Sequence, residues 1–228
     1  MTLNSASETA WVDYLKGVDT PTLSNAIEAL RLRPQSVGFA PHQIRCIFPE
    51  FGRMAGYAVT AQVETMTATT ADREALLSLY ETVLNSPKPA LVAFQEIGPQ
   101  PDYAAHCGEV MATIFQRLGA VGLISDCAVR DIPEVRALRF QYFARGAVAS
   151  HAYFHIVRVG VPIQVGGLVI QPNDLLHGDE NGLIVVPKEG LEKLPAAVEA
   201  VRVRERALME FVRGPDFNFA GLRQRFLE

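Results

Sequence analysis

The sequence predicts a single α/β domain with a mixed central sheet. Helical and strand-like segments alternate through the middle of the chain, and strand-like segments dominate residues 141–187. No segment of linker composition divides the 228 residues into two halves. Alternating helices and strands are typical of domains in which helices pack on a sheet. Because 49% of the residues are hydrophobic, the chain can form a full core.

The spacing of apolar residues over residues 9–33 predicts a helix in two pieces at the start of the chain. Thr20 is a candidate helix cap, Pro21 suits the first helical position, and Pro34 ends the pattern. A loop rich in proline and glycine follows. The next segments predict a strand, a helix and a short buried strand, at residues 57–65, 69–84 and 90–94.

The stretch of residues 106–131 organises the middle of the chain. A turn at 107–109 leads into a helical run that two glycines end, and a buried strand follows at 121–124. The loop after this strand presents three charged residues, Asp126, Arg130 and Asp131. This order predicts that backbone N–H groups, an arginine and several carboxylates lie near one another. Such a set suits a small anionic substrate and a divalent metal.

Strands are expected to dominate the later part of the chain before a long C-terminal helix. The pattern predicts, in order, a helix at 132–138, strands at 141–143 and 154–161, a hairpin corner at 166–174, a turn at 177–182, a strand at 183–186 and a charge-rich helix at 189–212. The tail carries many aromatic residues: Phe211, Phe217, Phe219 and Phe226. A tail of this kind is expected to dock on something, with a second subunit as one candidate.

The overall composition points away from several classes of protein. The formal net charge is −4 and there is no dense Lys/Arg cluster, so we expect no nucleic-acid partner. No apolar run is long enough to span a membrane, and the N-terminal residues lack the basic and apolar regions of a signal peptide. Three cysteines that lie far apart do not suggest a disulfide framework or a thiolate zinc site. We therefore expect a cytoplasmic protein that acts away from membranes.

Arg130 and Asp131 form the first candidate site. The arginine side chain offers a planar set of donors that matches a carboxylate or an enolate oxygen. The aspartate is a hard oxygen ligand that suits Mg²⁺ or Mn²⁺. The two residues could hold the two ends of one oxyacid. The alternative is an ordinary surface ion pair, because this dipeptide is common.

The turn before the helical run is the second candidate. Gly108 would let the backbone N–H groups of residues 108–111, including Val110 and Met111, approach an anion at the start of a helix. Glu109 could be a metal ligand or orient a water, or it could simply complement the helix dipole. His106 adjoins this turn and could donate a proton, or it could simply pack or form a hydrogen bond.

Two other histidines, His151 and His155, have the i, i+4 spacing of a zinc site on a helix. However, the segment reads HAYFH and lacks the glutamate of the zinc-protease motif. We assign this pair no metal. Walker, GxGxxG and GxSxG motifs are absent from the sequence.

The chain resembles the superfamily of ribonuclease-activity regulator A and the class II pyruvate aldolases. Three consecutive motifs carry the likeness: Gly108-Glu109-Val110-Met111-Ala112, Gly119-Ala120-Val121-Gly122 and Asp126-Cys127-Ala128-Val129-Arg130-Asp131. Supporting segments lie on both sides, at residues 22–26, 143–146 and 172–187. The resemblance spans most of residues 20–215.

This resemblance implies an α/β/α sandwich related to swivelling domains, assembled as a trimer or a dimer of trimers. The aldolases of the superfamily act on 4-hydroxy-4-methyl-2-oxoglutarate and 4-carboxy-4-hydroxy-2-oxoadipate. The implied activity is a lyase that releases pyruvate with Mg²⁺ or Mn²⁺, with oxaloacetate decarboxylation as a second activity.

The resemblance also implies a role for each site residue. Asp131 resembles the metal ligand, and Arg130 resembles the residue that holds the keto or enolate oxygen. The amides of residues 108–111 resemble the cradle for the substrate carboxylate. Glu109 and Asp126 would hold waters around the metal, and Glu205 of a neighbouring subunit is a candidate for a further acid.

Two positions depart from the family pattern. Cys127 stands where the family has glycine and would crowd the turn if the backbone there has a positive φ. Residues 92–97 lack the expected acid-glycine pattern. The alternatives to the aldolase are a non-catalytic regulator that binds a ribonuclease, and a lyase or decarboxylase acting on another oxo- or hydroxy-acid.

Overall fold

The computed structural model describes residues 5–69 and 72–227 and contains an eight-stranded sheet as its largest element. Seven strands run in the order β1-β6-β4-β3-β2-β11-β12, and β8 pairs with the far end of β2. Their bounds are β1 Arg45–Cys46, β2 Met54–Glu64, β3 Ala90–Glu96, β4 Ala120–Ser125, β6 Gln141–Ala144, β8 His155–Val159, β11 Leu175–Asp179 and β12 Gly182–Val186. Two short pairs lie outside it: β5 (Ala128–Val129) with β7 (Gly146–Ala147), and β9 (Ile163–Val165) with β10 (Leu168–Ile170).

The sheet is mixed, with a parallel centre. Strands β2, β3, β4 and β6 are parallel neighbours, whereas β1, β8, β11 and β12 pair antiparallel. The parallel strands therefore all end at one edge of the sheet. The loops that follow β3 and β4 leave from this edge, which is where open α/β sheets place their ligands.

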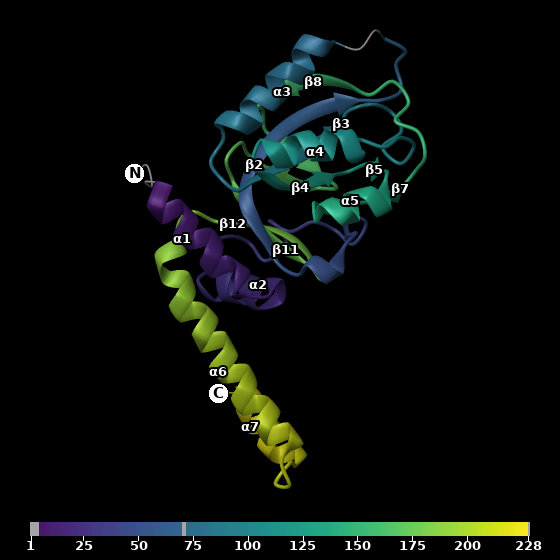
Figure 1. The fold of residues 1–228 in the computed structure, drawn as a ribbon. Coiled ribbons are helices and arrows are strands. Elements are labelled where there is room, and N and C mark those ends of the chain that lie inside the picture. The colour runs from purple at the N-terminus through teal and green to yellow at the C-terminus, as the bar shows by residue number, and fades with distance from the viewer. Residues whose placement is uncertain (1–4, 70–71, 228) are drawn as a thin grey trace.

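Three helices cover one face of the parallel strands (Figure 1): α3 (Arg73–Asn85), α4 (Glu109–Arg117) and α5 (Ile132–Leu138). Side chains alternate between the two faces, as the period of a strand requires. Val92 and Phe94 pack under the helices, and Leu91 and Ala93 pack under the β9–β10 hairpin on the other face. The central strand β2 is buried almost throughout, which fits a strand with neighbours on both sides.

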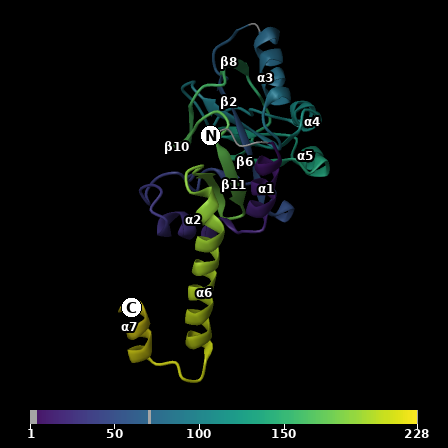
Figure 2. The same ribbon diagram turned by 90° about the vertical axis from the view of Figure 1, so that its left-hand side faces the viewer.

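The N- and C-terminal helices pack together against the β11–β12 end of the sheet. They are α1 (Ser5–Lys16), α2 (Thr20–Ala29) and the first half of α6 (Leu194–Arg213). The buried residues of α6 end at Val201, and the rest of the helix projects from the body (Figures 1 and 2). Helix α7 (Phe219–Leu227) turns back beside it. Two single 3₁₀ turns complete the elements, at Pro49–Phe51 and Leu191–Lys193.

The predicted fold class is confirmed: the chain is α/β with a mixed central sheet. The two helical pieces in residues 9–33 are present, but the cap of the second is Asp19 and not Thr20. The Asp19 carboxylate accepts the Thr22 N–H at 2.9 Å, and this bond stabilises the helix start.

Two other expectations about local structure need correction. Residues 177–179 belong to β11 and only residues 180–181 form the turn, because the backbone pairs of β11 with β12 continue to Asp179 and Gly182. The C-terminal helix begins at Leu194 and not at residue 189, because Gly190 has a positive φ of 93° that interrupts the helical backbone.

Candidate functional site

A cavity of about 280 Å³ opens between α3 and α4, where the loops after β3 and β4 meet. Several residues of the stretch predicted to organise the chain line it: His106, Cys107, Gly108, Val110, Met111, Arg130 and Asp131. The remaining wall comes from residues outside the three motifs: Leu76, Tyr80, Ala105, His151 and Phe154. A volume of this size accommodates a small organic acid.

Asp131 joins the loop after β5 to the start of α4. Its Oδ2 accepts the backbone N–H of Glu109 at 2.8 Å. Its carboxylate therefore satisfies one of the N–H groups that have no acceptor within the helix. The residue itself has a left-handed backbone, with φ of 57°. Among the described residues, its second oxygen accepts no hydrogen bond. The negative charge lies at the positive end of α4, where the helix dipole favours it.

Gly108 is required at this point because the loop and the helix come very close together. A Cβ atom added to Gly108 would lie 2.3 Å from Oδ2 of Asp131 and 2.9 Å from Nε of Arg130. A methyl group cannot fit at these distances without moving the charged side chains. Gly108 therefore lets both side chains of the predicted pair approach the first turn of α4.

Arg130 lies beside Asp131, with Nε 3.7 Å from Oδ2, and about a third of its side chain is exposed. The backbone N–H of Arg130 donates to the carbonyl of Cys107 at 2.9 Å, which ties the two loops together. The structure thus brings together Arg130, Asp131 and the first turn of α4 on one cavity.

The other predicted site residues lie outside the cavity wall. The Glu109 side chain is exposed at the start of α4, and only its backbone joins the contact with Asp131. Asp126 is buried behind the wall and accepts the Glu96 N–H at 2.7 Å. Glu205 lies on the projecting half of α6, where it accepts a hydrogen bond from Asn25 at 3.1 Å.

The two spaced histidines do not share a helix. His151 lies in a loop at the rim of the cavity, and His155 lies in β8, where its ring is 3.7 Å from the carboxylate of Glu64.

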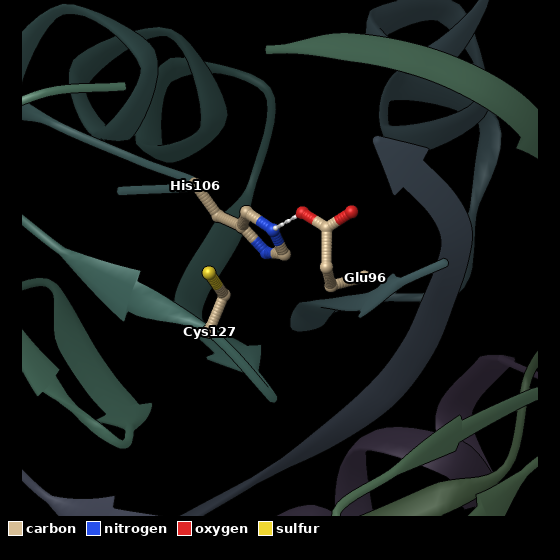
Figure 3. Close-up of side chains that lie close together, drawn as sticks. All are labelled: Glu96, His106 and Cys127. Atoms are coloured by element: carbon tan, nitrogen blue, oxygen red, sulfur yellow. Dashed lines mark hydrogen bonds and ion pairs between the residues drawn. The ribbon is translucent and has the colours of Figure 1, made fainter. Parts of the chain in front are cut away.

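His106 is the centre of a buried hydrogen-bond chain behind the cavity. Its Nε2 is 3.0 Å from Oε2 of Glu96, and its Nδ1 is 2.8 Å from the hydroxyl of Ser125. Figure 3 shows the ring pointing at the Glu96 carboxylate. A neutral ring with its proton on Nε2 satisfies both contacts, since Ser125 can then donate to Nδ1. Burial lowers the pKa of His106, which favours this neutral form.

Glu96 is the anionic end of this hydrogen-bond chain. Burial alone would raise its pKa, but hydrogen bonds from His106, Thr65 and the Gly98 N–H hold the pKa of Glu96 below its usual value. The residue was missed in the sequence because it ends a strand that was expected to stop at Phe94. The signal that could have revealed it is the acid followed by Gly98 two positions later.

Cys127 completes a cluster of possible metal ligands with Glu96 and His106, whose ligand atoms all lie within 4.8 Å of one another (Figure 3). However, both ring nitrogens of His106 are engaged, and the Cys127 thiol donates to the carbonyl of Ala104 at 2.8 Å. Burial raises the pKa of Cys127 to about 11, which disfavours the thiolate that binds metals. The cluster is therefore better described as a hydrogen-bond network.

The cysteine in place of the family glycine does not crowd its turn. Cys127 is absent from the residues with positive φ, so the backbone needs no glycine there. Its N–H donates to the Ser125 hydroxyl at 2.9 Å, and its side chain fills buried space. Cys127 would disturb the loop only with a positive φ, and it has none.

Asp126 carries the most perturbed carboxylate near the site. Burial raises the pKa of Asp126 to about 7, and the neighbouring Glu96 carboxylate adds to the rise, while Arg145 opposes it. It lies behind the cavity wall, where its carboxylate accepts the backbone N–H of Glu96 at the end of β3.

Asp131 is the residue of the cavity that could hold a magnesium or manganese ion. Asp131 is the one carboxylate among the described residues that line it, and its Oδ1 is free to bind. Mg²⁺ is commonly held by one or two carboxylates and keeps several waters. A cavity of this size leaves room for those waters and for an acid.

Comparison with known proteins identifies the family. Residues 20–185, which make up most of the chain, match the family model for RraA-like proteins, described as Aldolase/RraA. The chain belongs to this family. The predicted resemblance is thus confirmed, and the cavity lies within the matched RraA-like segment.

The RraA-like relatives include a named aldolase. The chain is 35% identical over 113 residues to a Halalkalibacterium halodurans protein named "Putative 4-hydroxy-4-methyl-2-oxoglutarate aldolase", a match that covers 47% of this chain and 54% of that one. A second match is an uncharacterised protein of Methanocaldococcus jannaschii, 29% identical over 100 residues, which covers 43% of this chain and 48% of that one. The matches thus span about half the length of these curated relatives.

Solved structures share the RraA-like fold at lower identity. A Streptomyces coelicolor protein, RraAS2, described as an unusual member of the RNase ES inhibitor RraA family, superposes with a TM-score of 0.72 and 20% identity. That match covers 88% of this chain and 98% of the other. An uncharacterised protein from Pseudomonas syringae gives a TM-score of 0.73 at 24% identity, over 96% and 93% of the two chains.

No helix in the described ranges is both long and apolar enough to cross a membrane.

Proposed function

We propose that this chain is a divalent-metal-dependent carbon–carbon lyase that releases pyruvate from a 4-hydroxy-2-oxoacid. One observation carries the proposal: Arg130, Asp131 and the first turn of α4 meet on a single cavity. The likeness to a named aldolase supports the same class of reaction. Oxaloacetate decarboxylation is a second expected activity, because loss of CO₂ from oxaloacetate also leaves the enolate of pyruvate.

The first turn of α4 would bind the substrate carboxylate. The N–H groups at the start of a helix have no intrahelical acceptors, and a carboxylate is favoured there. Because Asp131 takes the Glu109 N–H, the donors left to the substrate would be the N–H groups of Gly108, Val110 and Met111, which line the cavity. The substrate carboxylate and Asp131 would thus share the helix end.

Arg130 would hold the oxygen that becomes negative when the C3–C4 bond breaks. A guanidinium in a partly enclosed cavity stabilises an oxyanion more strongly than water does. Asp131 would hold Mg²⁺ or Mn²⁺, which when bound supplies Lewis-acid polarisation of the 2-oxoacid. The site contains no lysine among the described residues that line it, so a Schiff base is not part of the proposal.

The C4 hydroxyl must lose its proton when the C3–C4 bond breaks, on the side of the bond opposite to the enolate. The exposed Glu109 side chain, at the start of α4, would orient a water that accepts this proton. Glu205 of a second copy of the chain is the other candidate, since it is exposed on α6 beyond Val201, the last buried residue of that helix. A role for Glu205 requires that the C-terminal helix and tail lie at a subunit interface, and we propose such an interface in a trimer or a dimer of trimers.

The test is a pyruvate-release assay on 4-hydroxy-2-oxoacids and oxaloacetate, with Mg²⁺ or Mn²⁺ and with chelator. We expect turnover that stops with the chelator and returns with the metal. A lack of pyruvate from every acid at saturating metal would reject the lyase.

The second candidate is a non-catalytic regulator that binds a ribonuclease, since RraA proteins described as inhibitors of RNA processing share the fold. It predicts capture of a ribonuclease without turnover. The conjunction of Arg130 and Asp131 on one cavity favours the enzyme.

A further inference from the structure

The proposed reaction needs a group that takes the proton of the C4 hydroxyl, and the cavity wall limits which side chain can do so. The described lining residues with an ionisable side chain are Tyr80, His106, Cys107, Arg130, Asp131 and His151. A base must be unprotonated near neutral pH and must have a free acceptor atom within reach of the substrate. These two conditions exclude most of the set.

Three of these side chains hold their protons too firmly. Burial raises the pKa of the Tyr80 hydroxyl, and it raises the pKa of the Cys107 thiol to about 12. A guanidinium is not deprotonated in proteins, so Arg130 cannot accept a proton either. The proton of the C4 hydroxyl therefore has no path to these three side chains.

Two other side chains have their acceptor atoms engaged. The ring of His106 is buried, with its nitrogens 3.0 Å from Glu96 and 2.8 Å from the hydroxyl of Ser125. Asp131 gives one carboxylate oxygen to the Glu109 N–H, and its other oxygen is the one proposed to bind the metal. Neither side chain therefore offers a free acceptor atom to the hydroxyl.

His151 is the lining residue whose acceptor atoms are free. Its side chain makes no hydrogen bond, ion pair or ring contact with any other residue that the structure describes. The residue is also exposed, so it meets the solvent as well as the cavity. An imidazole in contact with solvent can release the proton that it has accepted, as a base must do in every turnover.

The loop that carries His151 is held by hydrogen bonds to two other segments of the chain. On one side, the carbonyl of Ser150 accepts the N–H of Ala105 at 2.8 Å, and Ala105 itself lines the cavity. On the other side, the N–H of Tyr153 donates to the carbonyl of Thr65 at 2.9 Å. The backbone at residue 151 is therefore fixed relative to the cavity.

The size of the cavity would bring a bound acid to His151. At about 280 Å³, the cavity is near the lower end of the size range of small-molecule sites. A 2-oxoacid held by Arg130 and Asp131 would therefore fill most of the space and contact the rest of the wall, His151 included.

We infer that His151 is the base of the lyase, and that one of its ring nitrogens accepts the proton of the C4 hydroxyl as the C3–C4 bond breaks. This inference rests on the proposed lyase function and adds a catalytic residue to it. It replaces the two acceptors named above, because neither Glu109 nor Glu205 is among the described residues that line the cavity.

The step is balanced without a co-reactant. The electron pair of the C3–C4 bond forms the enolate of pyruvate, and the electron pair of the O–H bond completes the carbonyl of the second product. The proton passes to the imidazole, which then releases it to the solvent. The enolate takes up a proton at C3, so the products are pyruvate and an aldehyde or ketone.

Oxaloacetate provides an internal comparison, because it has no C4 hydroxyl. Its C4 is a carboxylate that is already ionised, and loss of CO₂ forms the same enolate without any transfer of a hydroxyl proton. Arg130 and the metal held by Asp131 would thus serve both reactions, whereas His151 would serve only the lyase.

The experiment measures both activities in His151→Gln, with Mn²⁺ present. The substrates are oxaloacetate and the 4-hydroxy-2-oxoacid that the wild type cleaves fastest. We expect the ratio of lyase to decarboxylase turnover to fall by at least about 100-fold, because the variant lacks the base. Equal losses in the two activities would mean that His151 only shapes the cavity, and an unchanged ratio would likewise overturn the inference.

Chemical rescue distinguishes a base from a side chain that only supports the loop. His151→Ala leaves a gap at an exposed position that free imidazole can enter. Added imidazole should raise the lyase rate of this variant by at least about tenfold, since it restores an acceptor for the proton. The matched control is His42→Ala, because His42 is also an exposed histidine but is not among the described lining residues. It should keep the wild-type rate with and without imidazole, and a His151→Ala protein that does not respond to imidazole would contradict the inference.

The competing acceptor predicts the opposite pattern. If a water oriented by Glu109 takes the proton, Glu109→Gln should lower the ratio of lyase to decarboxylase turnover and His151→Gln should not. That result would overturn the role of His151 and leave the lyase in place. A wild-type protein that releases pyruvate from none of the acids would overturn the lyase itself.

Discussion

The Oδ2 atom of Asp131 accepts a hydrogen bond from the backbone N–H of Glu109 at 2.8 Å. This bond fixes the loop after β5 to the first turn of α4 and brings Arg130 to the same cavity. The proposed chemistry depends on this arrangement, because the substrate carboxylate, the metal and the oxyanion must all be held within one small volume.

Arg130 should be needed for turnover. Replacing it with alanine removes the group that would stabilise the developing oxyanion, so we expect kcat to fall by at least about 100-fold. The control is Arg136→Ala, since Arg136 pairs with Glu50 at 2.8 Å outside the cavity and should leave the rate near that of the wild type. Steady-state pyruvate release measures both variants, and an Arg130→Ala protein with undiminished activity would defeat the assignment.

Gly108→Ala should disturb the site through shape alone. The added methyl would lie 2.3 Å from the Asp131 carboxylate, so that side chain must move. Because a displacement of about 1 Å can reduce a rate by about 100-fold, we expect a loss of that order in kcat/KM. Gly146→Ala is the control, since a Cβ there meets nothing within 4 Å. Wild-type kinetics in a folded Gly108→Ala protein would show that the close approach does not matter.

Two substitutions distinguish the two places where a metal could bind. If Asp131 is the ligand, Asp131→Asn should weaken Mn²⁺ binding by at least about tenfold. Cys127→Ser should leave Mn²⁺ binding unchanged, because the thiol is protonated and bonded to the Ala104 carbonyl. Titration followed by electron paramagnetic resonance gives both affinities. The reverse pattern would move the metal to the buried cluster of Glu96, His106 and Cys127.

Asp126 should make the protein less stable as the pH rises. Its pKa is raised from 3.8 to about 7 by burial, so between these values the folded state holds a proton that the unfolded state has lost. The free energy of unfolding therefore falls across this window, and the stabilisation is lost above about pH 7. Asp126→Asn lacks this dependence and should gain stability relative to the wild type, on the order of 2–4 kcal/mol, between pH 4 and pH 8.

Urea denaturation of both proteins at several pH values isolates this difference from the other titrating groups. A difference in unfolding free energy that does not change with pH would mean that the folded protein holds Asp126 ionised.

The C-terminal tail should contribute to assembly and not to the stability of the body. The buried residues of α6 end at Val201, and α7 has none. Deleting residues 215–228 should therefore leave the unfolding midpoint within about 2 °C, since the change touches no part of the core. If the tail docks on a second subunit, light scattering should show a lower mass for the truncated chain. An unchanged mass would place the interface elsewhere.

The helices and strands followed largely from the local sequence. Buried strands such as Ala90–Glu96 are short apolar runs, and the glycines around Gly119 mark the end of α4. The capping of α2 was misassigned because Asp19 and Thr20 are both good caps and only the backbone geometry selects one. The turn at 177–182 was misplaced because strand pairing with a distant segment overrides a polar composition.

The candidate site could be predicted only in part. Gly108, Arg130 and Asp131 lie within one motif, so their convergence follows from a turn, a helix and a strand in sequence. The cavity residues Leu76 and Tyr80 come from a helix far from the motif and look like ordinary core residues in the sequence. Glu96 and Gly98 are close in the sequence, but the hydrogen bond between Glu96 and His106 forms only when the chain folds.

The contact between Asp131 and the start of α4 has a consequence for ion affinity. The same carboxylate that would attract a cation already faces the partial positive charge of a helix end, and this field opposes a second positive charge. We therefore expect the ion to be held loosely and to exchange rapidly with the solvent. Protein purified by extended dialysis should then emerge depleted of metal, and its occupancy should follow the concentration of the ion in the surrounding buffer.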